Sequence, residues 1–533
     1  MRKVFATFVF LLLAAMAGLS GCKNKKTTVS NSTYDRPLVF ARPSDSIDFD
    51  LARAEEGESI TIGINFIERL IDFKDGSAEL IPSLATSWEI SKDGKTYTFH
   101  LRSKVVFHDG TPLNADAVVF NVERQWKKDH PAYSFSAPYS YWENMGMDQV
   151  LESVRKVDDL TVEFKLKYPF SPFLSAIATP FLSVESPTAI LKYGKTIDQH
   201  PVGTGPYTLK TWKKDDFMEL EAFPDYWGTK PKIKRVIVRV IPDNQVRLLE
   251  LKKGSVHIMV YPNLSDLADI KNDPNIQVLS QPGLDIGYLA FNLKKPPLDK
   301  LEVRQAISMA IDRKRIVDEL FQGYASVAKN MLPPTVMGYN SDVPQIKYDV
   351  EKAKTLLDKA GIRDLSLELW AMPVARPYNP NAKKMAEFIQ ADLKRVGINS
   401  KIVSYDWGTY LDKIGKGEGQ VVIIGWNGDN NDPDNFLFTV WSKESALRTP
   451  TNNYAFYMNE DVNNWLKQGR TETKLELRAD LYKKVQMQMY KDLPGLPINH
   501  SVVVVPIRKE VEGFALMPTG DRRFANVSFR SSP

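Results

Sequence analysis

The chain has 533 residues, of which 43% are hydrophobic and 25% charged, and its formal net charge is +5. So small a charge over this length gives no support for binding nucleic acid or another polyanion, and the composition is that of an ordinary globular protein. The length exceeds what one hydrophobic core normally organises, so we expect two or three domains.

The N-terminal segment has the anatomy of an export signal. A positive end at residues 2–3 precedes an apolar core over residues 4–19, and the sequence Leu-Ser-Gly then leads into Cys22. The apolar run is shorter than the roughly 20 residues that a membrane-spanning helix needs, which disfavours an uncleaved anchor. We therefore predict a lipoprotein signal peptide over residues 1–21 and a lipid on Cys22.

Cys22 is the only cysteine of the chain, so no disulfide can form within the mature protein. Lipid attached there would hold the protein at the membrane, because each buried methylene contributes about 0.8 kcal/mol. Residues 23–33 are polar and cannot bury enough apolar surface to fold. We expect residues 22–36 to be a tether and the first strand to lie at residues 37–41. The folded part would then lie outside the cytoplasm, anchored on the periplasmic side of the membrane or at the cell surface.

Two pairs of alternating segments predict antiparallel hairpins. Segments 84–90 and 96–101 flank the turn sequence Ser-Lys-Asp-Gly-Lys, and segments 154–156 and 162–166 flank a pair of aspartates. Between the hairpins, Asn114 precedes an apolar helical pattern and is a favourable N-cap residue. We expect a helix to begin directly after it.

From residue 203 onward, strand-like and helix-like segments alternate. The predicted strands begin after the sequence Gly203–Pro206 and continue at residues 235–241, 288–293, 365–370, 401–404 and 420–425; the predicted helices cover residues 244–253, 303–311, 349–361 and 382–396. Alternation of this kind is typical of an α/β domain.

Motifs for catalysis and for metal binding are missing from the sequence. It contains no nucleophile elbow, no phosphate-binding loop and no His-Glu-x-x-His, and its six histidines are scattered. The acidic run at residues 429–435 resembles a calcium loop, but Pro433 and Val440 occupy positions where an EF-hand requires calcium ligands. We therefore predict no catalytic residue, no metal and no cofactor, and a polar loop that caps the preceding strand is favoured over a looser cation site.

Two charged residues follow predicted strands directly. Arg376 lies shortly after the strand at residues 365–370, and Asp429 lies shortly after the strand at residues 420–425. In α/β sheets, ligands gather outside the carboxyl ends of strands. An arginine at that edge can bind a carboxylate through two hydrogen bonds, and an aspartate can accept from an ammonium group. The pattern alone leaves surface ion pairs open as an alternative.

The chain from about residue 37 to residue 528 resembles the dipeptide-binding members of the extracellular solute-binding protein family 5, which also contains oligopeptide-, nickel-, haem- and glutathione-binding proteins. The segments that carry the resemblance to the broad family are Leu84–Trp88, Asp93–Phe99, Phe107–Pro112, Pro201–Tyr207 and Asp225–Gly228. Those closer to the dipeptide-binding group are Arg376–Asn381 and Gly425–Asn435.

The resemblance implies a two-lobed, periplasmic-binding-protein-like fold of class II, which closes by hinge motion and carries an extra inserted α/β domain. We expect lobe I at residues 37–76, 200–281 and 505–533, the inserted domain at 77–199 and lobe II at 282–504. The protein would be the monomeric substrate-binding component of an ATP-driven importer (an ABC transporter) and would hand dipeptides to the permease subunits.

The resemblance also implies the roles of individual residues. Arg376 would hold the α-carboxylate of the peptide and Asp429 its α-ammonium, while Tyr378, Trp407 and Trp426 would line the same pocket. The chain lacks the disulfide cysteines that dipeptide-binding relatives often carry, and its segment 42–48 differs from theirs. Glutathione and haem therefore stay open as cargo, and a secreted hydrolase is a more distant alternative.

Overall fold

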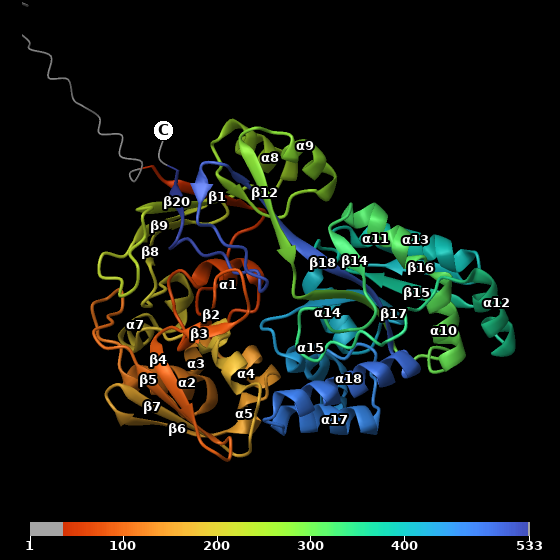
Figure 1. Ribbon diagram of the computed structural model, residues 1–533, viewed down its shortest axis with the longest axis horizontal. Helices are drawn as coiled ribbons and strands as arrows, with labels where there is room; N and C mark the ends of the chain where they lie inside the picture. The colour runs from red at the N-terminus through yellow and green to blue at the C-terminus, as the bar shows by residue number, and fades with distance from the viewer. Residues whose placement is uncertain (1–35, 531–533) are drawn as a thin grey trace, which may run out of the picture.

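The structure is a computed structural model that describes residues 36–530. The predicted signal peptide, the predicted lipid site at Cys22 and nearly all of the predicted tether lie outside this range. Within it, no helix combines the length and the apolar character that crossing a bilayer requires. Two lobes lie side by side, and a further unit packs below the first of them (Figure 1).

The first lobe is built on the sheet whose strands follow the order β18-β11-β1-β10-β9-β8. Its central strand β1 pairs in parallel with β10 and β11, and it is almost completely buried. The strands of the first lobe are β1 (Leu38–Arg42), β2 (Ile71–Phe73), β3 (Leu80–Pro82), β8 (Tyr207–Lys213), β9 (Phe217–Ala222), β10 (Arg235–Val240), β11 (Ile258–Met259), β12 (Ile276–Pro282), β19 (Val511–Glu512) and β20 (Ser528–Phe529). Its helices are α1 (Gly57–Gly63), α8 (Asn244–Lys253), η3 (Leu264–Asp266) and α9 (Leu267–Lys271).

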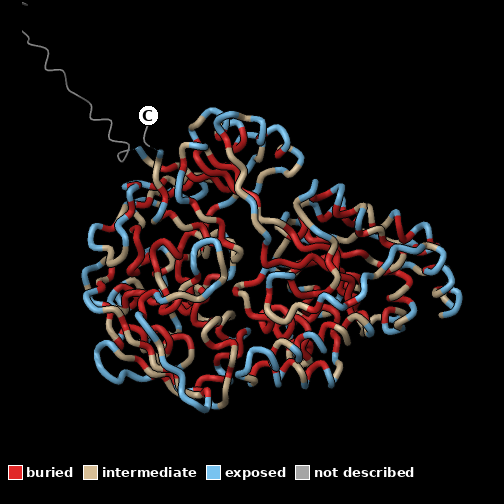
Figure 2. The backbone as a smooth tube through the Cα atoms, in the orientation of Figure 1, coloured by how far each residue is buried: buried red, intermediate tan, exposed pale blue. Residues whose placement is uncertain are grey.

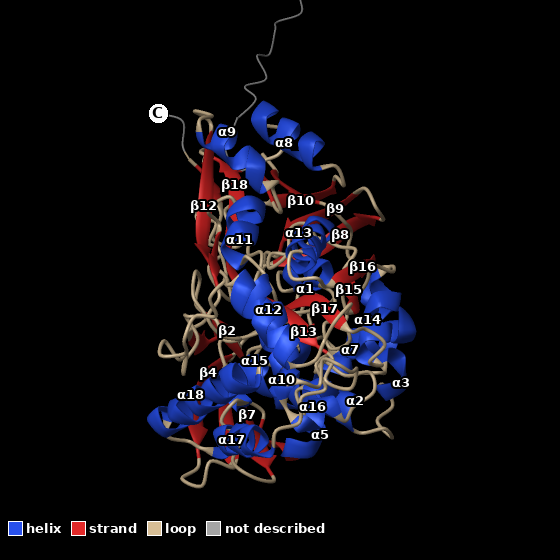
Figure 3. Cartoon of the chain, turned by 90° about the vertical axis from the view of Figure 1, so that its right-hand side faces the viewer, coloured by secondary structure: helices blue, strands red, loops and turns tan. Residues whose placement is uncertain are grey.

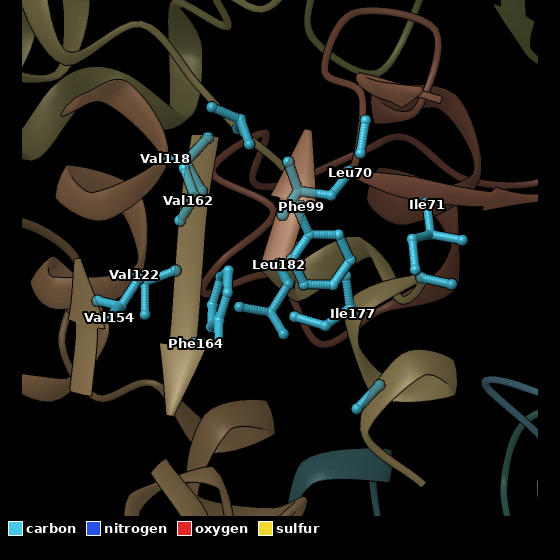
Figure 4. Packing of buried hydrophobic residues seen from close by; sticks show 14 of the residues in the cluster. Leu70, Ile71, Phe99, Val118, Val122, Val154, Val162, Phe164, Ile177 and Leu182 are labelled. Atoms are coloured by element: carbon cyan, nitrogen blue, oxygen red, sulfur yellow. The ribbon is translucent and has the colours of Figure 1, made fainter. Parts of the chain in front are cut away.

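The inserted unit contains a four-stranded antiparallel sheet of order β4-β5-β7-β6. One face of this sheet packs against α2, and Phe99, Phe164 and Val122 meet in the core between them (Figure 4). Leu70 and Ile71 of the first lobe join the same core, so the two units share one apolar interior (Figure 4). Its strands are β4 (Ala85–Ile90), β5 (Thr96–Leu101), β6 (Leu151–Asp158) and β7 (Thr161–Leu166). Its helices are α2 (Ala115–Trp126), α3 (Tyr133–Ser136), α4 (Ser140–Asn144), α5 (Met147–Val150), α6 (Phe173–Ile177), η1 (Pro180–Leu182), α7 (Pro187–Tyr193) and η2 (Gly194–Gln199).

The second lobe is built on strands in the order β16-β15-β17-β13-β18, with β14 also paired to β18. Helices cover both faces of this sheet and enclose an apolar core on each side. Figure 2 shows that the backbone of this lobe is buried at its centre and exposed at its rim. Its strands are β13 (Asp285–Phe291), β14 (Ala325–Val327), β15 (Ser366–Ala371), β16 (Asn399–Val403) and β17 (Val421–Asn427). Its helices are α10 (Leu301–Ala310), α11 (Arg313–Phe321), α12 (Val350–Lys359), α13 (Ala382–Lys394), α14 (Trp407–Gly415), α15 (Pro433–Trp441), α16 (Lys443–Ala446), α17 (Glu460–Thr471) and α18 (Leu475–Asp492).

One strand, β18 (Gly495–Arg508), belongs to both lobes. Its first half pairs with β13 and β14, and its second half pairs with β12 and β11. The chain also crosses between the lobes from β12 to β13, where the buried carboxylate of Asp285 accepts hydrogen bonds from the backbone N–H and the hydroxyl of Ser501. These two crossings form the hinge side of the molecule. The predicted limit between residues 504 and 505 falls within a continuous strand, and the domain limits as a whole stay a prediction.

The carboxylate of Glu68 links separate segments of the first lobe near its junction with the inserted unit. It accepts hydrogen bonds from the hydroxyl groups of Thr204 (2.7 Å) and Tyr226 (2.9 Å) and from the indole N–H of Trp227 (2.7 Å). Among the residues described, it forms no ion pair. Burial without a cation raises the pKa of Glu68 to about 7, although the three donors oppose this shift.

Glu68 should therefore make stability depend on pH. Because its folded-state pKa is raised, its contribution to stability is complete below about pH 4.5 and is lost as the pH rises through about 7. In Glu68→Gln this dependence should disappear. The difference in unfolding free energy, wild type minus variant, should fall by roughly 2–3 kcal/mol over that window. Urea unfolding of the wild type and the variant at a series of pH values measures this difference. The exposed Glu55→Gln is the control, and a flat difference for Glu68→Gln would contradict the assignment.

Candidate functional site

Three neighbouring parallel strands of the second lobe end at the same edge of its sheet. β15 pairs in parallel with β16 on one side and with β17 on the other, and Ala371 at the end of β15 lies opposite Ile423 of β17. The segments that leave these strands carry Arg376, Trp407 and Asp429. The structure thus gathers the predicted site residues at the carboxyl edge of one sheet, where α/β proteins bind ligands.

Arg376 presents an exposed guanidinium group at this edge. A tight turn fixes its backbone, because the N–H of Arg376 donates to the carbonyl of Asn379 and the N–H of Asn379 donates back, both at 2.9 Å. The guanidinium carbon lies 5.3 Å from the ring centre of Trp407, within cation–π range. No carboxylate among residues 36–530 forms an ion pair with it. Its positive charge is therefore held in position without an ion-pair partner in the described part of the chain.

Tyr378 anchors the same turn to the sheet. Its side chain is buried, and burial raises the pKa of its hydroxyl to about 12. The ring lies against the backbone of β17 at Gly425, so close that a Cβ atom there would come within 2.3 Å of a ring carbon. A glycine is therefore required at this position to let the turn that carries Arg376 rest on the strand that leads to Asp429.

Gly425→Ala should therefore destabilise the protein by about 1–3 kcal/mol, the usual cost of overpacking a tight contact. Gly57→Ala is the matched control, because a Cβ atom at Gly57 meets no atom within 4 Å. Denaturant unfolding of both variants measures the difference. Equal stabilities would show that Tyr378 is not held against β17 in this way.

Asp429 is partly buried and is surrounded by neutral donors. One carboxylate oxygen accepts from the side-chain amide of Asn435 at 2.9 Å, and the other accepts from the hydroxyl of Tyr141 at 3.2 Å. Burial raises the pKa of Asp429, and these two hydrogen bonds oppose the shift. No basic side chain among the residues described forms an ion pair with it. A cationic group arriving here would therefore meet a negative charge that lacks a cation.

The side-chain amide of Asn435 ties two of the predicted site residues together. Its oxygen accepts from the indole N–H of Trp426 at 3.0 Å and from the backbone N–H of Asp429 at 3.1 Å. Its nitrogen donates to the Asp429 carboxylate. The ring of Trp426 and the carboxylate of Asp429 are thus held in fixed positions by one side chain.

The remainder of the acidic run has a structural role. Asp432 caps the start of α15 and forms a buried bidentate ion pair with Arg478, with both distances 2.7 Å. Within the described range, no group of three or more acidic, histidine or cysteine side chains is placed to hold a metal ion. The carboxylate of Asp432 is thus satisfied by contacts within the protein.

Sequence reasoning missed Tyr141 and did not single out Asn435. Tyr141 is 288 positions from Asp429 and belongs to the inserted unit, so no local pattern relates the two. Asn435 lies within the acidic run, but only the folded chain shows that its amide turns back to Asp429. Arg376, Tyr378, Trp407, Trp426 and Asp429 lie along the predicted edge, and their roles in binding stay predictions.

Comparison with known proteins identifies relatives over nearly the whole chain. Residues 79–447 match the family model described as bacterial extracellular solute-binding proteins, family 5 Middle. The chain is 42% identical to a dipeptide-binding protein of Escherichia coli, over 94% of this chain and 96% of that protein. It is 37% identical to heme-binding protein A of Haemophilus influenzae, over 97% of each.

A solved structure also resembles the chain closely. It is the periplasmic binding protein DppA of Helicobacter pylori in complex with the peptide STSA, with a TM-score of 0.85 and 36% identity over 93% of this chain and 99% of that one. The similarity confirms the predicted fold class, a two-lobed periplasmic-binding-protein-like fold of mixed α/β content.

Proposed function

Because this chain belongs to the bacterial extracellular solute-binding proteins of family 5, we propose that it captures dipeptides outside the cytoplasm and delivers them to an ATP-driven importer. The observation that carries this proposal is the pair of opposite charges at one sheet edge. Arg376 has no acidic partner and Asp429 no basic partner among residues 36–530, and each is held in place by the surrounding chain. A ligand that carries both charges would supply both partners.

A free dipeptide has this chemistry, since it is an extended chain under about 7 Å long with a carboxylate and an ammonium at its ends. Arg376 would bind the carboxylate, and Asp429 would accept from the ammonium. Charge-assisted hydrogen bonds of this kind contribute about 1.5–3 kcal/mol each. Trp407, Trp426 and Tyr378 would line the space around the peptide without selecting strongly among side chains.

The cellular setting follows from the family and from the N-terminal sequence. Family members are extracytoplasmic solute-binding components of transporters, and we propose that lipid on Cys22 anchors this chain at the membrane beside its permease. We further propose that it acts as a monomer and releases cargo unchanged. Turnover of a peptide by the purified protein would instead favour the hydrolase.

A second candidate cargo is haem, and the observation that favours it is the similarity to a heme-binding protein at 37% identity. Haem has propionate carboxylates, which Arg376 could bind, but it has no ammonium group for Asp429. Glutathione carries both groups and fits the charge pair better than haem does. The arrangement around Asp429 therefore favours a peptide.

The cargo can be identified by native mass spectrometry and absorbance of the protein as purified from its own cells. A set of bound masses equal to those of dipeptides is expected. A single mass of glutathione, or a Soret band from haem, would overturn the choice of cargo and keep the transport role.

A further inference from the structure

The second lobe touches the inserted unit on the side opposite the hinge. Figure 3 shows β12 and β18 at one end of the molecule and α17 and α5 at the other. At that other end, α15 and α17 of the second lobe lie near α4 and α5 of the inserted unit (Figure 1). We call this region the front contact and define it by Met145, Phe170, Ser171, Asp434 and Arg470. It joins parts of the chain that are about 300 residues apart.

Arg470 of α17 lies at the centre of the front contact and is only 9% exposed. Across the contact, its guanidinium group donates to the carbonyl of Met145 at 3.1 Å and lies 4.7 Å from the ring centre of Phe170. Within its own lobe, it pairs with Asp434 at 3.2 Å and lies 3.9 Å from the ring centre of Phe438. One guanidinium group thus sits between aromatic rings from two separate units.

Ser171 of the inserted unit adds hydrogen bonds to the same segment. Its backbone N–H donates to the carbonyl of Arg470 at 2.7 Å, and its hydroxyl donates to the carbonyl of Glu472. A backbone hydrogen bond between separate units requires both segments of the chain to be held in one fixed position. The front contact is therefore a specific docking of the two units.

The front contact is connected to the ligand-binding edge on both sides. Met145 directly follows α4, which carries Tyr141, and the hydroxyl of Tyr141 donates to Asp429. Asp434 precedes Asn435, whose amide holds the same carboxylate. Arg470 therefore joins the two elements that meet at Asp429.

We propose that Arg470 is a positioning residue that latches the second lobe to the inserted unit and thereby sets how slowly bound cargo leaves. This inference rests on the proposed function. Arg470 does not touch the sheet edge that carries Arg376; it acts through α4 and α15. Arg478 on the neighbouring helix makes a contrast, because its ion pair with Asp432 lies wholly within the second lobe and serves the fold rather than closure.

The test compares Arg470→Ala with Lys467→Ala, a control on the exposed face of α17 whose ion pair with Glu444 stays within the second lobe. Calorimetry and stopped-flow binding of alanyl-leucine should give a dissociation constant about tenfold higher for Arg470→Ala, mostly through faster dissociation. Lys467→Ala should bind like the wild type. Ser171→Ala, which removes one hydroxyl from the other side of the contact, should change binding in the same direction by a smaller factor.

Hydrogen–deuterium exchange distinguishes a latch from a purely structural role of Arg470. The amide of Ser171 is protected only while the front contact is closed, so peptides that contain it should exchange about tenfold faster in Arg470→Ala at equal thermal stability. Wild-type affinity and wild-type exchange in Arg470→Ala would overturn the latch.

The outcome for the latch can be separated from that for the cargo. If the wild type binds no peptide, the proposed function fails, and the latch is then judged on exchange in the ligand-free protein alone. Faster exchange at Ser171 in ligand-free Arg470→Ala would still support it, and unchanged exchange would reject it.

Discussion

Arg376→Ala is expected to weaken dipeptide binding by roughly 2–5 kcal/mol, or about 30- to several-thousand-fold in dissociation constant. The reason is that removal of the guanidinium leaves the carboxylate of the bound peptide without its cationic partner. Arg376→Lys should restore only part of the loss, because an ammonium group cannot make two parallel hydrogen bonds to one carboxylate. Calorimetric titration with alanyl-leucine measures both variants.

Arg363→Ala is the matched control for this prediction. Arg363 is an exposed arginine that precedes β15, whereas Arg376 follows the same strand, so the two lie at opposite edges of one sheet. The control should bind like the wild type. An unchanged affinity in Arg376→Ala would remove this residue from the site.

Asp429→Asn is expected to weaken binding by a similar roughly 2–5 kcal/mol while it stabilises the ligand-free protein. The substitution keeps an oxygen that can accept from Tyr141, but it removes the negative charge that the peptide ammonium would meet. Burial raises the pKa of Asp429, so the ionised group costs stability in the folded state. That cost grows as the pH rises through the folded-state pKa, and the variant is free of it.

The two effects of Asp429→Asn can be measured separately, by calorimetry for binding and by thermal unfolding without ligand for stability. Asp129→Asn, at an exposed loop position, is the control and should change neither. A variant that binds normally would contradict the ammonium role. One that is less stable than the wild type at neutral pH would contradict the account of its burial.

Local signals in the sequence predicted local structure well. Asn114 caps α2 and Asp349 caps α12, each through its side chain, and α8 ends at Gly254, whose φ of 81° suits a glycine. The strands that position Arg376 and Asp429 also lie within a few residues of their predicted limits. These features depend on residues close together in the chain, where capping and alternation act directly.

Long-range features could not be predicted in this way. No element was predicted from the sequence after residue 425, although β18 joins both lobes by pairing with β11, β12, β13 and β14. Its partners change partway along the strand, and nothing in its own residues encodes that change. The contact of Tyr141 with Asp429 and the front contact at Arg470 depend in the same way on how separate units dock.

The most direct test of the proposed capture of peptides by both charged ends is one calorimetric series on the wild-type protein. It compares alanyl-leucine with its N-acetyl form, its C-terminal amide and the tetrapeptide Ser-Thr-Ser-Ala. Tight binding of the free dipeptide is expected, with losses of about 2–5 kcal/mol in binding free energy for each blocked end. The tetrapeptide tests how strongly binding depends on the distance between the two charged groups of the peptide. Equal binding of the blocked and free dipeptides would contradict the central claim.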